Sequence, residues 1–205
     1  MMREADMTDS LREFAEDLLD DGQLANDRRG IPRGPWARPR RAPKGSAAVR
    51  PPAPQGEVEA WLRDNGWHPG HREREAAEQL VKARVQDSVR QGFPLAPWGE
   101  VTDFVSRYAG LVFPVPRAPE RKFVPDPTMG YADDAEDIVE LATDLGHELF
   151  PVGYETVEAG IVLMDDIGRF FYLHHTGPYF LGQDEAQALS SLMRGDQDEV
   201  DACFV

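Results

Sequence analysis

The sequence predicts an α+β fold in which N-terminal helices pack on a mostly antiparallel sheet of about five to six strands. Segments with apolar residues at helical spacing occupy the folded part of the chain up to residue 110, and short strand-like runs, interrupted by one helix, follow. Helices and strands do not alternate regularly, as they do in proteins with parallel sheets. This order favours α+β over a doubly wound α/β fold.

Three helices are expected before the first strand. The first covers residues 57–64, and the second covers residues 72–91, with Gly92 as its natural cap. The third starts near Pro97, because proline is well suited to the first turn of a helix, and it ends near Gly110. Each helix has one apolar stripe, so each should bury one face.

The strand-like runs begin directly after the third helix. Two short runs next to prolines suit strands near a sheet edge, because proline cannot donate a ladder hydrogen bond. A helix with an almost purely anionic outer face interrupts the strands, and a turn-forming tetrapeptide joins the last two. The expected strands are 111–115, 122–124, 149–153, 160–164 and 169–174, and the expected helices are 133–145 and 184–193.

Composition divides the chain into three parts. Residues 1–21 are acidic and carry a capping-box pattern followed by apolar residues at helical spacing, which predicts a short amphipathic helix. Residues 22–56 should form a Pro/Arg-rich linker, because frequent prolines without apolar periodicity cannot bury enough surface to offset backbone ordering. Residues 57–205 should form the folded domain.

The functions of the two N-terminal parts stay open at this point. Between residues 28 and 50 there are eight basic residues and no acidic one. This segment could touch RNA or an anionic membrane, or it could be a solvated linker that rests against its own acidic domain. The first helix could bind a partner or dock on its own core.

The charge of the chain limits its partners. There are 37 acidic and 22 basic residues, and the formal net charge is −15. Such a surface repels nucleic acid over most of its area, so we expect no nucleic-acid partner. The single cysteine, Cys203, cannot form an intramolecular disulfide, and neither a signal peptide nor a membrane span is predicted. We therefore expect a cytoplasmic protein without a membrane partner.

Patterns typical of enzymes are missing or weak. There is no phosphate-binding loop, dinucleotide fingerprint or nucleophile elbow. His68 and His71 flank a Pro-Gly turn and lack further metal ligands. Asp165 and Asp166 are neighbours in a predicted turn that exposes both, which gives no reason for their pKa values to differ. We expect no catalytic residue, no metal site and no cofactor.

Five short pieces, taken in order, resemble the SUKH superfamily of immunity proteins, which is related to the SMI/KNR cell-wall regulators. The resemblance is strongest to the third SUKH branch and covers about residues 57–195. This sequence has His71 where the family usually has arginine, and Ala109 in place of a glycine. The pieces are Trp61-Leu62 with Gly66-Trp67-His68-Pro69-Gly70-His71, then Phe104 to Leu111, Leu149 to Gly153, Leu163 to Tyr172, and Glu185 to Gly195.

The resemblance implies a non-catalytic antidote that binds and neutralises a cognate toxin domain, often a nuclease or nucleic-acid deaminase. It also implies that the motif positions are mostly structural. A regulatory or scaffold module like the SMI/KNR relatives is the alternative, and an enzyme of unrecognised type is a third reading. A conserved toxin gene beside this one would discriminate between them. The oligomeric state is not predicted.

Acidity supports a basic partner independently of the resemblance. Residues 126–205 contain 18 acidic residues and only two basic ones, Arg169 and Arg194. A toxin that handles nucleic acid needs a basic groove, to which an anionic surface is complementary. Acidic faces also keep proteins soluble, which is the simpler explanation of the same composition. The predicted partner-binding residues are Asp133, Asp134, Asp137, Glu140, Asp144, Tyr154, Asp165, Asp166 and Tyr179.

Overall fold

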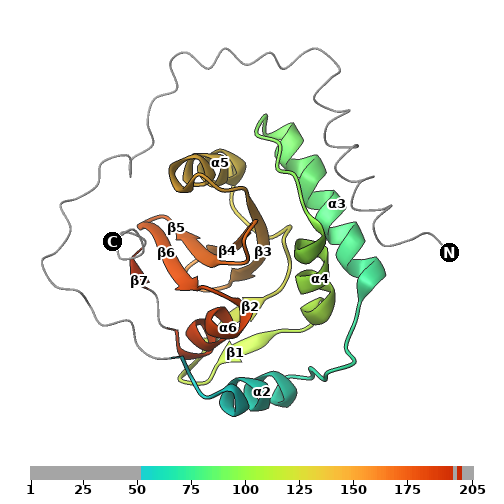
Figure 1. Ribbon diagram of the computed structural model, residues 1–205, viewed down its shortest axis with the longest axis vertical. Helices are drawn as coiled ribbons and strands as arrows, with labels where there is room; N and C mark the ends of the chain where they lie inside the picture. Colours follow the sequence, from blue (N-terminus) through green and yellow to red (C-terminus); the bar gives the residue numbers. More distant parts are fainter. Residues whose placement is uncertain (1–51, 196–197, 200–205) are drawn as a thin grey trace, which may run out of the picture.

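The computed structural model describes residues 52–195 and 198–199 (Figure 1). The predicted helix within residues 1–21 and most of the predicted linker lie outside the described residues. The elements, in chain order, are α2 (Gln55–Asp64), α3 (Arg74–Arg90), α4 (Gly99–Tyr108), β1 (Phe113–Val115), β2 (Ala118–Val124), α5 (Asp134–Leu145), β3 (Leu149–Glu155), β4 (Gly160–Asp165), β5 (Phe170–His174), β6 (Gly177–Gly182), α6 (Glu185–Arg194) and β7 (Asp198–Glu199).

The strands form one antiparallel sheet whose spatial order is the same as their order in the chain. This confirms the predicted α+β class and the mostly antiparallel sheet. The described residues contribute seven strands, of which β7 has only two residues. The sequence did not predict β6, because its Gly-Pro start resembles a loop. In the structure the two turn residues His175 and Thr176 reverse the chain directly after β5, and Gly177, with φ of +135°, begins β6.

The helices surround the sheet and close a single aromatic core. Figure 1 shows α3 and α4 side by side on one flank, α5 next to β3, and α2 against α6. Phe104 of α4 contacts Phe170 of β5, with ring centroids 5.2 Å apart, and Phe113 contacts Phe123 across β1 and β2. All four rings are fully buried. None of the described helices has both the length and the apolar character that a membrane crossing requires.

The folded part of the chain begins earlier than the sequence suggested. Ala53 is buried, and its backbone N–H donates a 2.6 Å hydrogen bond to Oγ of Ser190 on α6. The helix α2 then starts at Gln55. Residues 53–56, which were predicted as the end of the linker, therefore belong to the folded domain.

Candidate partner-binding surface

The helix α5 separates apolar and acidic residues on opposite faces. Its inward positions, Ala135, Ile138, Leu141 and Leu145, are buried. Its outward positions carry carboxylates that are exposed or half-buried. Gly146, in the left-handed region with φ of +68°, ends the helix. The predicted acidic helix is therefore present, and its outward carboxylates are Asp133, Glu136, Asp137, Glu140 and Asp144.

Asp134 does not belong to this outward face, which corrects the sequence prediction. Its side chain is only 1% exposed, and Oδ1 accepts a 2.8 Å hydrogen bond from Nη2 of the buried Arg84. Gln91 donates to the same oxygen and accepts from the backbone N–H of Ala135. These contacts tie the start of α5 to α3. Asp134 is therefore an internal ion-pair residue and cannot touch a partner.

Asp165 is a second correction, because its side chain is fully buried instead of exposed in the turn. Its carboxylate accepts hydrogen bonds from the backbone N–H groups of Ile167 and Arg169, at 3.2 and 2.6 Å. The Nε of Arg169 donates to the other oxygen, also at 2.6 Å. The carboxylate thus satisfies the backbone of the predicted β4–β5 turn, which Gly168 completes with φ of +87°.

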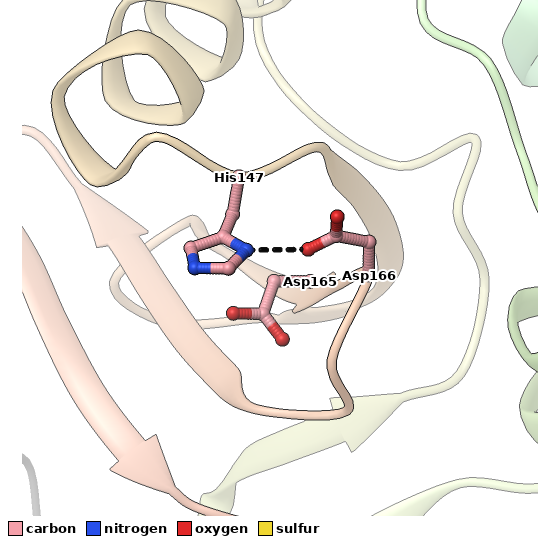
Figure 2. A group of neighbouring side chains, drawn as sticks. All are labelled: His147, Asp165 and Asp166. Atoms are coloured by element: carbon pink, nitrogen blue, oxygen red, sulfur yellow. Dashed lines mark hydrogen bonds and ion pairs between the residues drawn. The ribbon is translucent and has the colours of Figure 1, made fainter.

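Asp166 lies on the surface and joins the β4–β5 turn to the loop that follows α5. Its Oδ1 lies 2.7 Å from Nδ1 of His147, and its backbone N–H donates to the carbonyl of Glu148 (Figure 2). The acidic end of α5 and the turn are consequently held together. We call the set Asp133, Asp137, Glu140, Asp144, Glu148 and Asp166 the acidic surface.

The side chains of His147, Asp165 and Asp166 are also close enough to be considered as metal ligands. Each offers one ligand atom, and these three atoms lie within 4.8 Å of one another. Both oxygens of Asp165, however, already accept hydrogen bonds, one of them from the cationic Arg169. Nδ1 of His147 is engaged with Asp166. The arrangement therefore fits a set of hydrogen bonds that joins the loop after α5 to the β4–β5 turn.

An exposed isoleucine adds an apolar group to the acidic surface. Ile167 follows Asp166 at the tip of the turn and is 60% exposed. Single exposed apolar side chains are common on protein surfaces, but the position of Ile167 directly beside Asp166 makes it available for contact with a partner. Ile167 was predicted as part of the turn but not as a binding residue, although an apolar residue between aspartate and glycine in a tight turn has no core to enter.

The two predicted aromatic anchors point to opposite faces of the sheet. Tyr154 pairs with Ile161, whereas Tyr179 pairs with Tyr172, the partner of Val162. Ile161 and Val162 are consecutive, so their side chains lie on opposite faces. Ile161 approaches Gly130 next to Asp134, which places Tyr154 on the side of α5. The structure therefore brings Tyr154 to the face that carries α5 and leaves Tyr179 on the other face.

Asp137 differs electrostatically from its neighbours on α5. Burial raises the pKa of its carboxyl group, and the neighbouring carboxylates of Asp134 and Asp133 raise it further. The hydroxyl of Tyr131 opposes this rise by donating a 2.6 Å hydrogen bond to Oδ2. The ionised carboxylate of Asp137 therefore lowers the free energy of unfolding of the protein.

Replacing Asp137 with asparagine should raise the unfolding midpoint at neutral pH. A carboxyl group whose pKa is higher in the folded than in the unfolded chain opposes folding once it is ionised. Because the side chain is half-exposed, we expect a gain of about 0.5 kcal/mol. The gain should shrink as the pH falls through the raised pKa and nearly disappear about one pH unit below the unfolded pKa of aspartate, near pH 3. Thermal unfolding of both proteins from pH 7 to about pH 3 measures it, and a pH-independent gain would contradict the charge explanation.

The comparisons with known proteins identify the family. The model of the SUKH-3 immunity protein family matches residues 54–195, about two-thirds of the chain. The chain belongs to the SUKH-3 immunity protein family. Neither a search of curated proteins nor a search of solved structures found a match. The matched range runs from the residue before α2 to Gly195, the C-cap of α6, and so includes the acidic surface.

The sequence motifs of this SUKH-3 protein meet inside the fold. Trp67 of the first motif packs on Tyr108 of the second, with ring planes 27° apart. The hydroxyl of Tyr108 donates a 2.6 Å hydrogen bond to Glu185, in the fifth motif, and Arg107 forms an ion pair with the same carboxylate. These contacts join α4 to α6. The first, second and fifth motifs therefore stabilise the fold, whereas the fourth motif includes Asp166 of the acidic surface.

The two departures from the family pattern contact each other. Nε2 of His71 lies 3.1 Å from the carbonyl oxygen of Ala109. Ala109 has φ of −53°, which any residue can adopt, whereas the next residue, Gly110, has φ of +79°. The left-handed position expected at the end of α4 is thus confirmed at Gly110, and an alanine at position 109 is unstrained.

Proposed function

We propose that this SUKH-3 protein is a non-catalytic cytoplasmic antidote that binds and neutralises a cognate toxin acting on nucleic acid, of the nuclease or deaminase type. The observation that carries the proposal is the family match over residues 54–195. The acidic surface is the proposed contact region, with Ile167 and Tyr154 as apolar anchors. The toxin is proposed to present a basic surface.

The distribution of charge supports this contact region. Residues 126–195 contain fourteen acidic residues and only Arg169 and Arg194 as bases. Three of the acids are buried and paired with arginines, namely Asp134, Glu155 and Asp165. The acidic surface gathers six of the others on one helix and the adjoining loops. Such a patch attracts a basic groove at long range, and apolar anchors hold the complex once it forms.

The first experiment tests whether the protein neutralises a toxin at all. The chain is co-expressed with the products of the neighbouring open reading frames, each of which is also expressed alone. We expect one product to arrest growth by itself, and co-expression to restore growth and yield a stable complex. If none of these products binds the chain or is neutralised by it, the antidote function is wrong.

The second experiment tests the acidic surface. Glu140→Lys, Asp144→Lys and Glu148→Lys together should slow association with the toxin by about tenfold or more at low salt, because steering of this kind changes association rates by 10 to 10³. The effect should weaken with salt, since charges are screened over about 8 Å at 0.15 M. Stopped-flow or surface-plasmon measurements at several salt concentrations give the rates.

A matched triple variant separates the surface from the net charge. Glu75→Lys, Glu78→Lys and Glu100→Lys change the charge by the same amount on α3 and α4, away from the acidic surface. We expect this control to slow association much less. Equal slowing by both variants would show that the total charge of the chain matters and that α5 does not form the interface.

A regulatory or scaffold module like the SMI/KNR regulators is the second candidate function. It is favoured by the N-terminal residues before 54, which the family match does not include. This candidate requires those residues for partner binding. Neutralisation by a chain whose residues 1–51 are replaced by an unrelated Gly/Ser sequence would exclude it as the main function.

A further inference from the structure

A groove of about 460 Å³ lies between α2, the β1–β2 hairpin and the end of α6, outside the acidic surface. Trp61, Val115 and Met193 give it an apolar floor, and Pro116 and Pro119 form part of its rim. On the wall formed by α2, the exposed carboxylates of Glu57 and Asp64 lie two helical turns apart on the same face. The residues that line the groove include no base.

The groove is rigid because its central aromatic side chain is fixed. Nε1 of Trp61 donates a 2.8 Å hydrogen bond to the carbonyl of Pro114, and its ring lies 5.3 Å from that of Phe113. These contacts join α2 to β1. Pro114, Pro116 and Pro119 have no backbone N–H, so the rim offers apolar rings and carbonyls. Such a surface fits a proline-rich, cationic peptide better than an acidic or strongly hydrogen-bonding one.

The chain enters the described domain beside this groove. Ala53 is bonded to Ser190, and Met193, three residues further along α6, lines the groove. Residues three apart on a helix are neighbours, about 5–6 Å between Cβ atoms. Residues 28–50, which immediately precede this entry point, contain eight basic residues, no acid, four prolines and Trp36.

We propose that the Arg/Pro-rich segment, residues 28–50, docks in this groove of its own chain. Its guanidinium groups would pair with Glu57 and Asp64, and its proline and tryptophan rings would cover the apolar floor. The ten-residue α2 is about 15 Å long. At about 3.1 Å per residue, five or so extended residues span it, so the segment is long enough to fold back. Because the segment is tethered, its effective concentration is of millimolar order, and a weak affinity is sufficient.

The docking is tested in the full-length, ¹⁵N-labelled protein by paramagnetic relaxation. A nitroxide is attached at Ala42→Cys in a Cys203→Ser background, and the reduced label serves as the reference. Amide signals of the groove, such as those of Ala60, Asn65 and Val115, should lose most of their intensity. Signals of α5 should be unaffected. Raising the salt to about 1 M, where charges are screened over about 3 Å, should restore much of the lost intensity.

Two charge-reversal pairs make the test specific. Glu57→Lys with Asp64→Lys should restore the groove signals, because the carboxylates that hold the segment are removed. Glu75→Lys with Glu100→Lys, which are exposed acids in the first turns of α3 and α4, should leave the broadening unchanged. Thermal unfolding of each variant shows whether its fold is retained.

Three outcomes would overturn the proposal. The first is full intensity of the groove signals in the wild-type background. The second is equal broadening over the whole domain, which indicates a nonspecific charge attraction. The third is comparable broadening of the groove signals in a mixture of spin-labelled ¹⁴N chain and ¹⁵N chain without a spin label, which would assign the groove to the segment of a second copy. None of them affects the proposed antidote function, because the groove and the acidic surface are separate.

Discussion

Replacing Arg84 with methionine is expected to lower the free energy of unfolding by about 3–5 kcal/mol, because it leaves a buried carboxylate without its cation. Arg84 and Asp134 are 2% and 1% exposed and lie 2.8 Å apart. After the substitution only the amide of Gln91 would still donate to that carboxylate. Water cannot replace the lost partner without opening the contact between α3 and α5. Urea or thermal unfolding measures the loss.

A second variant distinguishes this cause from a simple loss of packing. Arg84→Met combined with Asp134→Asn removes the buried charge while keeping the shape of the site, so it should recover a large part of the stability. On the surface, Arg63 pairs with Glu59, and both side chains are about half exposed. Arg63→Met should therefore cost at most about 1 kcal/mol. If the double variant is as unstable as Arg84→Met, the buried charge is not the cause.

The fold could be predicted from the sequence because its elements have clear periods and end signals. The apolar spacing of α4 and α5, together with Gly110 after α4, predicts helices within one or two residues of those observed. The strand β6 was missed because its identity depends on pairing with β5, and its Gly-Pro start has no strand propensity. The local pattern of apolar residues is therefore sufficient to predict these helices. It does not predict a strand whose formation depends on pairing with a neighbouring strand.

The candidate site was predicted only in part, because charge alone does not show where a side chain points. Asp134 precedes Ile138 by four residues and Leu141 by seven, so it lies on the buried face of α5. This spacing could have predicted that Asp134 is buried, but the neighbouring acidic residues suggested an exposed face instead. Its partner, Arg84, is fifty residues away, and no local pattern connects the two. Asp165 was misplaced for a related reason, since the first residue of a turn often bonds its own backbone.

Replacing Gly160 with alanine should destabilise the protein by about 1–3 kcal/mol, the usual cost of adding a methyl group to a packed core. A Cβ at this position would lie 1.9 Å from Cζ of Tyr172, far inside the contact distance. The ring of Tyr172 is fully buried, and its hydroxyl donates to Glu155, whose carboxylate also accepts the backbone N–H groups of Val157 and Glu158. The ring therefore cannot move without disturbing the β3–β4 turn.

The same substitution at Gly56 provides the control, with the opposite expected sign. No atom lies within 4 Å of a Cβ built there, and Gly56 is inside α2, where alanine is favoured by up to about 1 kcal/mol. Each kcal/mol corresponds to about 2–4 °C in the unfolding midpoint of a protein of this size. Calorimetry should therefore show a lower midpoint for Gly160→Ala and an equal or higher one for Gly56→Ala. If Gly160→Ala unfolds like the wild type, the Tyr172 ring has room to shift, and its bond to Glu155 does not fix the hairpin.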